Sequence, residues 1–259
     1  MENLLQCPKC FSELRRELPN FKCADCSYIV PTIGAGVPIF VEECGSNVDL
    51  RDSFDEGAEI EGLLKKLPHD AKILNVGSRL KGLKALHGGV RNLDNCYYSN
   101  VDFVADLQEL PFKNDCLDAI LLVDALEHTK KPADALEHVY RALKPGGYLY
   151  VNISFLRPTH AASGDYRRYT ENGIKALFKN YHEIDFGVSV GPSATLSRII
   201  REYLAILTSF GSERLYKLGI NFWGLLTFWI KYFDFFMKKN RMAGKLASCF
   251  YAIYRKPCG

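Results

Sequence analysis

The chain has 259 residues, of which 47% are hydrophobic and 24% charged, values typical of a globular protein that buries a core. Its 33 basic and 30 acidic residues leave a net charge of +3, too small to support nucleic-acid binding by itself. The first ten residues, MENLLQCPKC, lack the basic and apolar regions of a secretory signal, and nine cysteines fit reduced thiols and a metal site better than a disulfide framework. We therefore expect a cytoplasmic protein.

The chain opens with a cysteine-rich segment, residues 1–42, that we predict to be a zinc ribbon. Two C-x-x-C pairs, Cys7 with Cys10 and Cys23 with Cys26, are separated by twelve residues. Each pair can bind one ion through two thiolates, and two pairs close a tetrahedral Zn²⁺ site that leaves no open position for water. Four unrelated core cysteines are the alternative. A segment this short depends on the metal for much of its stability.

The next predicted elements are a linker helix and a parallel sheet. Residues 43–68 are charged and helical in pattern, and the chain then alternates between short apolar runs and amphipathic stretches, as a parallel sheet covered by helices requires. The predicted strands of this part are residues 72–76, 90–93, 101–105, 117–123, 148–154 and 182–190. A helix from Pro132 to the Pro-Gly-Gly of residues 145–147 lies between the strands 117–123 and 148–154.

The last predicted segments are a helical insertion and a final strand. The core extends over residues 69–195, residues 196–246 are rich in aromatic and basic residues and form a helical cap, and residues 247–259 return to the sheet. The run from Leu218 to Ile230 is shorter than the roughly 20 residues that span a bilayer. For residues 218–236 we favour a packed helix over contact with an apolar acceptor or a membrane interface.

Several motifs in the core coincide with those of one family. ILNVGSRLKG has the spacing of a nucleotide-binding turn, and DLQELPFKNDCLDAILLVDALEHTKKPADALEHVYRALKPGGYLYV follows it. Over about residues 70–190 the chain resembles the class I S-adenosylmethionine-dependent methyltransferases, most closely their type 11 group. The segment 1–42 is similar to the zinc ribbons of tRNA-methyltransferase activator subunits. The resemblance implies a Rossmann-like, seven-stranded α/β sheet with helices on both faces and an antiparallel last strand.

The resemblance also implies a set of cofactor contacts for S-adenosylmethionine. The methionine end would lie at the glycine turn, the ribose at the end of the second strand, the adenine beside the third and the methyl group after the fourth. The chain departs from the family at two places, with Arg79 instead of the second glycine and Asn75 where an acidic residue is common, so either a working or a relict pocket fits. The implied contacts are Asn75, Gly77, Ser78, Arg79, Gly82, Asp94, Asp106, Leu107 and Asp124.

Candidate catalytic residues follow the fourth and fifth strands. His128 is the first candidate base, and the alternative is a residue that holds the backbone at a helix start. His160 and Asp165 form a second candidate pair that binds the acceptor. Arg167 or Arg168 could clamp a carboxylate or phosphate of the acceptor, and a network that anchors the loop is the alternative.

These observations predict a methyltransferase acting on an O or N atom of an unidentified acceptor, with a small molecule or a lipid or glycan precursor favoured. One alternative is a catalytically inactive relative whose zinc ribbon docks on protein or RNA. Another is an RNA methyltransferase, which requires a contiguous basic face. The acceptor and the oligomeric state carry no sequence signal.

Overall fold

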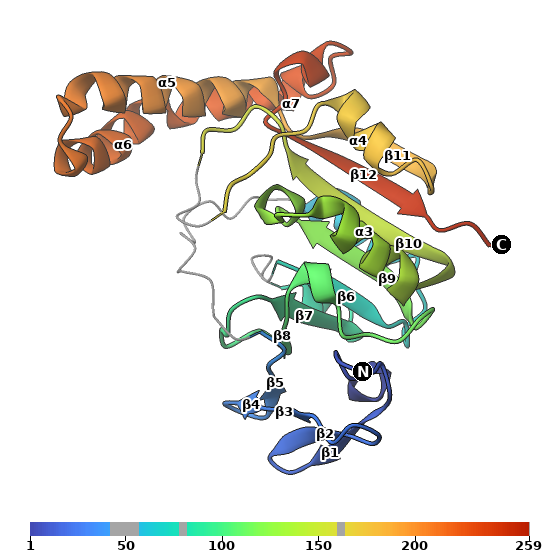
Figure 1. Cartoon of the computed structure of the whole chain (residues 1–259). Coiled ribbons are helices and arrows are strands. Elements are labelled where there is room, and N and C mark those ends of the chain that lie inside the picture. The colour runs from blue at the N-terminus through green and yellow to red at the C-terminus, as the bar shows by residue number, and fades with distance from the viewer. Residues whose placement is uncertain (42–56, 78–81, 160–163, 259) are drawn as a thin grey trace.

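The structure is a computed structural model that describes residues 1–41, 57–77, 82–159 and 164–258. Its centre is a seven-stranded sheet with the strand order β11-β12-β10-β9-β6-β7-β8 (Figure 1). The strands are β6 (Ile73–Val76), β7 (Val90–Asp94), β8 (Phe103–Val104), β9 (Leu117–Val123), β10 (Leu143–Ser154), β11 (His182–Val190) and β12 (Cys249–Arg255).

The direction of the strands confirms the predicted sheet. β12 pairs antiparallel with both β10 and β11, and every other pairing in the sheet is parallel. β11 therefore runs parallel to β10, so the carboxyl ends of six strands meet at one edge. In open α/β sheets this edge is where ligands bind.

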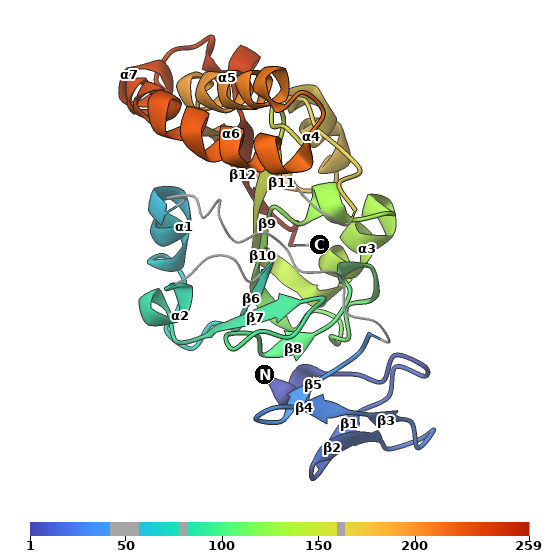
Figure 2. The ribbon, with the colours of Figure 1, turned by 90° about the vertical axis from the view of Figure 1, so that its left-hand side faces the viewer.

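Helices cover the two faces of the sheet, and each face has its own hydrophobic cluster. Successive residues of β9 alternate between them, with Ile120 and Leu122 in one cluster and Leu121 and Val123 in the other. This alternation is the reason that the strand is apolar throughout. Figure 2 shows the sheet between two pairs of helices, α1 (Gly57–Leu64) and α2 (Leu83–Leu86) on one side, α3 (Pro132–Ala142) and α4 (Glu171–Leu177) on the other.

The Pro-Gly-Gly of residues 145–147 has a role other than the predicted one. α3 begins at Pro132, as expected, but it ends at Ala142, and β10 begins at the next residue. Leu143 already pairs with Leu117, and the register then shifts before pairing resumes at Tyr148. Gly146, at φ 75°, lies within this irregularity. The motif therefore forms a bulge inside β10 and does not end the helix.

The predicted helical insertion before the last strand is confirmed. It contains α5 (Pro192–Ser209), α6 (Glu213–Thr227), the 3₁₀ helix η4 (Phe228–Phe233) and α7 (Asp234–Met237). α5 begins four residues before the predicted segment, since the Asp234 carboxylate accepts hydrogen bonds from the backbone N–H groups of Ser193 and Ala194 at 2.8 and 3.1 Å. α5 and α6 extend away from the sheet as a pair (Figure 1). None of the described helices combines the length and the apolar character that crossing a bilayer requires.

The N-terminal segment packs on the β8 side of the sheet (Figure 2). It contains a three-stranded sheet and a two-stranded sheet. Leu5 bridges to Phe112, and the backbone N–H of Phe40 donates to the carbonyl of Val104 at 2.8 Å. The segment therefore shares a hydrophobic cluster with the core. Its strands are β1 (Leu14–Glu17), β2 (Asn20–Cys23), β3 (Ile29–Val30), β4 (Thr32–Ile33) and β5 (Val37–Pro38).

Candidate functional site

The turn after β6 requires glycine at its first position. Gly77 has φ 84°, and a β-carbon there would lie 2.6 Å from the carbonyl oxygen of Val123 at the end of β9. Both the backbone angle and the lack of space therefore exclude a side chain. Gly82, at the other end of the turn, has φ 90° and forms the N-cap of α2, but no atom lies within 4 Å of the position of its β-carbon.

Asn75 is fully buried on β6, two residues before the turn. Its side-chain amide donates to Asn92 Oδ1 on β7 at 3.0 Å. Its own Oδ1 is buried and has no hydrogen-bond partner in the described part of the chain. A buried acceptor of this kind costs free energy unless a ligand or water supplies a donor.

The acidic residues at the ends of β7 and β8 lie at the same edge. Asp94 is the last residue of β7 and is half-buried, and its Oδ1 accepts a bond from the backbone N–H of Cys96 at 3.4 Å. Asp106 follows β8 and caps the 3₁₀ helix η2 (Leu107–Glu109), and Oδ1 accepts from the N–H of Gln108 at 2.8 Å. Leu107 is buried.

Asp124, directly after β9, forms a buried ion pair with Arg157, which follows β10. Arg157 Nη1 donates to Asp124 Oδ2 at 2.8 Å, and the two side chains are 1% and 4% exposed. Asp124 holds φ 48°, an uncommon angle for a residue with a side chain. The pair ties together the ends of two neighbouring strands.

Glu127 adds a second carboxyl group to this buried cluster. It is completely buried within the 3₁₀ helix η3 (Leu126–His128). Burial, reinforced by the negative charge of Asp124, raises the pKa of Glu127 to about 7, while Ser154 and Arg157 act in the opposite direction. A carboxyl group with so large a shift at this edge is typical of a functional site.

His128 connects the end of η3 to the loop after β10. Its Nδ1 lies 2.9 Å from the carbonyl oxygen of Gly164. A carbonyl oxygen can only accept, so Nδ1 carries the proton, and Nε2 carries the lone pair whenever the ring is neutral. The contact provides the backbone-holding role considered from the sequence, and it orients the ring.

The two candidate clamp residues make contacts within the loop. Arg168 forms a two-point ion pair with Asp165, with Nη2 donating to Oδ2 at 2.7 Å, and it also donates to the carbonyl of Arg157 at 3.0 Å. The hydrogen bonds that Arg168 donates to the Asp165 carboxylate raise the pKa of Arg168. Arg167 donates to the carbonyl of Thr129 at 2.7 Å. Arg167 therefore ties the loop to the segment after β9, whereas Arg168 makes its contacts within the loop after β10.

Three of the predicted site residues, Ser78, Arg79 and His160, lie outside the described residues. Five of the others form two groups along the carboxyl edge. Asn75, Gly77 and Asp94 lie at the ends of β6 and β7, whereas Asp124 and His128 follow β9. Glu127 and Arg157 are not among the predicted site residues, although Glu127 lies inside the stretch 106–151 that carries the family resemblance.

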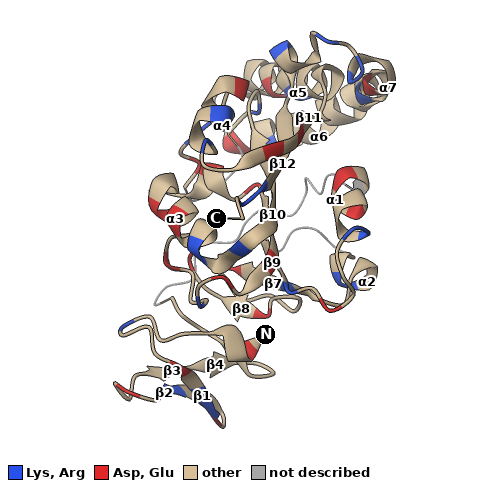
Figure 3. Cartoon of the chain, turned by 90° about the vertical axis from the view of Figure 1, so that its right-hand side faces the viewer, with Lys and Arg blue, Asp and Glu red and all other residues tan. Residues whose placement is uncertain are grey.

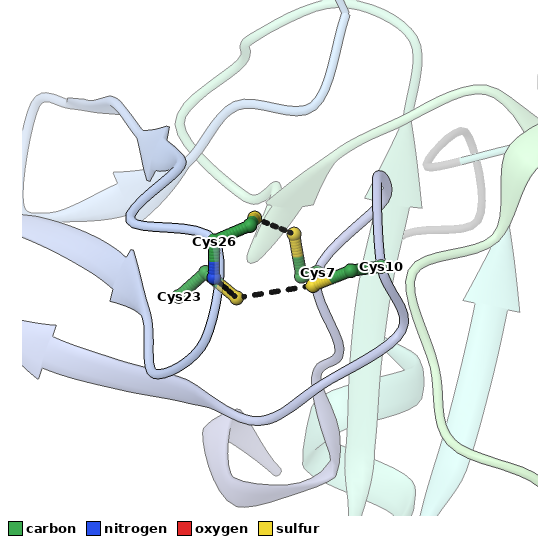
Figure 4. A group of neighbouring side chains, drawn as sticks. All are labelled: Cys7, Cys10, Cys23 and Cys26. Atoms are coloured by element: carbon green, nitrogen blue, oxygen red, sulfur yellow. Dashed lines mark hydrogen bonds between the residues drawn. The ribbon is translucent and has the colours of Figure 1, made fainter.

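The four cysteines of the N-terminal segment form one cluster (Figure 4). All four sulfur atoms lie within 4.8 Å of one another, with Cys7 and Cys26 3.6 Å apart and Cys10 and Cys23 3.3 Å apart. For tetrahedral Zn–S bonds of about 2.3 Å the expected S···S separation is about 3.8 Å, so the cluster has the size of a zinc site. Cys96, in contrast, is disulfide-bonded, a bond that the cysteine spacing does not signal and that corrects the expectation of reduced thiols there.

A surface groove lies between the N-terminal segment and α3, away from the carboxyl edge of the sheet. It adjoins the end of α3 that precedes β10, so it is no part of the candidate site. Its lining residues are Gln6, Phe11, Asn114, Glu137, His138 and Arg141.

Sheet order and family comparison agree on the class of this domain. Strand order and the single antiparallel strand are those expected of a class I methyltransferase fold. Residues 75–151 match the family model Methyltransf_11, which describes a methyltransferase domain.

Curated relatives include the ubiquinone/menaquinone biosynthesis C-methyltransferase UbiE of Coxiella burnetii, 33% identical over 93 residues. That alignment covers 36% of this chain and 32% of the relative, so the chain spans about a third of the relative's length. Among solved structures, the [4+2]-cyclase SpnF has a TM-score of 0.48 at 18% identity over 87% of this chain and 90% of that one. Haemonchus contortus phosphoethanolamine N-methyltransferase 2 has a TM-score of 0.48 at 17% identity, over 78% of this chain and 53% of that one.

Proposed function

We propose that the domain binds S-adenosylmethionine and transfers its methyl group to an O or N atom of a small molecule or of a lipid or glycan precursor. Gly77 is the observation that carries this proposal. Its positive φ and the 2.6 Å distance from its β-carbon position to the Val123 carbonyl oxygen exclude a side chain, so the turn at the carboxyl end of β6 requires glycine, at the edge of the sheet where ligands bind in open α/β folds.

The residues at the edge fit this cofactor. The unpaired Oδ1 of Asn75 offers an acceptor to its ammonium group, and the Asp94 carboxylate offers one to its ribose hydroxyls. Asp106 and Leu107 would adjoin the adenine. The methionine end would adjoin Ser78, Arg79 and Gly82. When bound, the cofactor supplies an electrophilic methyl group on a sulfonium centre.

We assign His128 as the base that removes the acceptor's proton. Its Nδ1–H is held by Gly164, which leaves the lone pair on Nε2. The ion pair of Asp124 with Arg157 and the partly protonated Glu127 determine the electrostatic environment of the segment that carries His128. Asp165 serves by holding Arg168, which fixes the loop that carries Gly164.

The cysteine cluster is proposed to hold a structural Zn²⁺ ion. Four thiolates at this separation complete a tetrahedral shell. Backbone N–H groups also point at the sulfurs, from Lys9 to Cys7 at 3.4 Å and from Cys26 to Cys23 at 3.5 Å. Such bonds stabilise thiolates.

The test is calorimetric titration of S-adenosylmethionine into the intact protein. We expect binding by the wild type, at least tenfold weaker binding by Asp94→Ala because a charge-assisted bond is lost, and unchanged binding by Asp134→Ala, an exposed carboxylate of α3. Absence of both heat and thermal shift at millimolar ligand would overturn the proposal. Binding that appears only in Arg79→Gly would identify a relict pocket, the inactive relative considered above.

A further inference from the structure

The helices of the insertion expose a continuous set of large apolar side chains. We define the hairpin as residues 192–237, comprising α5, α6, η4 and α7. One set of them recurs every three or four positions along α5 and again along α6 into η4, and Leu207, Leu226, Phe228, Phe233 and Phe235 are exposed beside it. In the recurring set the exposed fractions range from 45% to 90% at Leu196, Ile199, Tyr203, Ile206, Phe210, Leu215, Leu218, Phe222, Leu225, Trp229, Tyr232 and Phe236.

We propose that the hairpin binds the surface of a lipid bilayer that contains anionic phospholipids. The contacts between α5 and α6 are the first argument, since they use small and polar residues. A β-carbon on Gly219 would lie 3.3 Å from that of Ala205, and Trp223 donates to Thr208 at 3.2 Å. Tyr216 donates to Glu202 at 2.5 Å.

Helices that pair in water bury their large apolar side chains between them. In this pair small residues and side-chain hydrogen bonds form the close contacts, with Trp223 half-buried among them, and most of the large apolar side chains lie outside. That arrangement is typical of helices whose surroundings are lipid.

The charge of the hairpin and of the nine residues that follow it indicates the kind of lipid. Residues 192–246 contain nine basic and three acidic residues, whereas the rest of the chain has 24 and 27. Asp234 is buried against the start of α5, and Glu202 accepts the bond from Tyr216, so the acidic groups are largely occupied. Five of the nine basic residues lie within η4 or after it, at Lys231, Lys238, Lys239, Arg241 and Lys245.

Figure 3 shows basic residues in the loop that follows α7. Lysines and arginines beside Trp229 and Tyr232 form the combination that anchors proteins at a headgroup layer. A second copy of the chain fits this surface less well, because two such basic faces would repel each other. No described helix spans a bilayer, so the hairpin lies in the interface.

The hairpin leaves the sheet at the carboxyl edge. α5 starts two residues after β11 ends, and Arg198 Nη1 donates to Ser248 Oγ at 2.7 Å, next to β12. Membrane binding would therefore hold this edge near the headgroups. Access to a lipid-borne acceptor is a consequence that rests on the proposed function, whereas membrane binding itself does not.

The experiment is co-sedimentation of the full chain with vesicles of phosphatidylcholine, with and without phosphatidylglycerol. We expect binding that requires phosphatidylglycerol and weakens with salt. The double variant Phe222→Asp/Leu225→Asp should bind at least ~10-fold more weakly. Ile184→Asp, which changes an exposed apolar residue of β11, is the matched control and should bind as the wild type does.

Circular dichroism verifies that each variant is folded, and sedimentation velocity gives its oligomeric state. Lys238→Gln/Lys239→Gln should lose much of the preference for phosphatidylglycerol while keeping its fold. The proposal is overturned if the wild type stays in the supernatant with both vesicle types. It is also overturned if the wild type is a dimer that Phe222→Asp/Leu225→Asp converts to monomer, since the hairpin then covers a second copy.

Discussion

At the scale of single residues, the buried cluster beside the candidate base His128 contains more acidic than basic side chains. Arg157 is the cation facing two carboxyl groups, those of Asp124 and Glu127, and all three side chains are nearly inaccessible to solvent. The cluster is neutral only when one carboxyl holds a proton, and the raised pKa of Glu127 identifies that group.

The raised pKa of Glu127 predicts a pH dependence of stability. The folded state retains the proton between the ordinary pKa of 4.5 and the folded value of about 7, whereas the unfolded chain releases it. The free energy of unfolding therefore falls by about 3 kcal/mol through this group as the pH rises across that window. Urea unfolding at pH values on both sides of the window should show that Glu127→Gln removes this part of the slope.

Glu137→Gln, on the exposed side of α3, is the control and should keep the wild-type slope. Equal slopes for Glu127→Gln and the wild type would show that Glu127 is ionised throughout and would contradict the assignment.

The glycine turn allows backbone strain to be separated from crowding. Gly82→Ala meets only the positive φ and should cost about 1 kcal/mol. Gly77→Ala meets in addition the Val123 carbonyl and should cost about 3 kcal/mol or more, with loss of cofactor binding. Thermal denaturation and titration of both variants compare them; equal costs would show that the turn moves freely away from β9.

The sequence predicts some of these residues and not others for a physical reason. Gly77 and Asp94 lie at the ends of strands that the sequence pattern predicts, so the strand order places them at the carboxyl edge of the sheet. Arg157 pairs with a residue 33 positions away, across a strand and a helix, and no local pattern carries that contact. The local sequence around Glu127 fits an exposed helix start, and only the structure shows that η3 is buried.

At the scale of elements, the sequence predicts the existence of helices and strands better than the residues at which they end. Hydrophobic spacing locates α3 and the strands, but a Pro-Gly-Gly after a helix fits a helix end and a strand bulge equally well. Only the pairing of Leu143 with Leu117 decides between them. The exposed hairpin is a similar case, because its spacing predicts helices whether water or lipid surrounds them.

The proposed zinc site of the N-terminal segment can be tested at its cysteines. We expect the purified protein to contain a single zinc ion per chain by elemental analysis, and Cys23→Ser to lose it because a thiolate ligand is removed. Cys258→Ser, which alters an exposed free thiol near the C-terminus, should retain the metal. Metal retained in full by Cys23→Ser would place the ion elsewhere.

At the scale of the whole molecule, the N-terminal segment and the core share one hydrophobic cluster. Leu5 and Phe21 belong to it together with Leu110 and Phe112 of the core, and each is at most 2% exposed. Surfaces joined in this way unfold together, so the two parts should behave as one cooperative unit.

Calorimetry should therefore give a single unfolding transition for the metal-loaded chain. Phe112→Ala removes the centre of the contact and should cost about 3–5 kcal/mol and separate the segment's melting from that of the core. Phe11→Ala, at a residue 62% exposed, should leave the single transition unchanged. Two transitions in the wild type would show that the contact is weak.

The position of the N-terminal segment also determines how the sheet meets other chains. Ile39 pairs in parallel with Val104, so backbone from the segment occupies the outer side of β8. The opposite border is β11, which carries Glu183 and Asp185 and loses register with β12 at two points. Strand-to-strand polymerisation needs flat, unoccupied borders. With one border covered and the other charged and irregular, the sheet is protected from growing into fibrils.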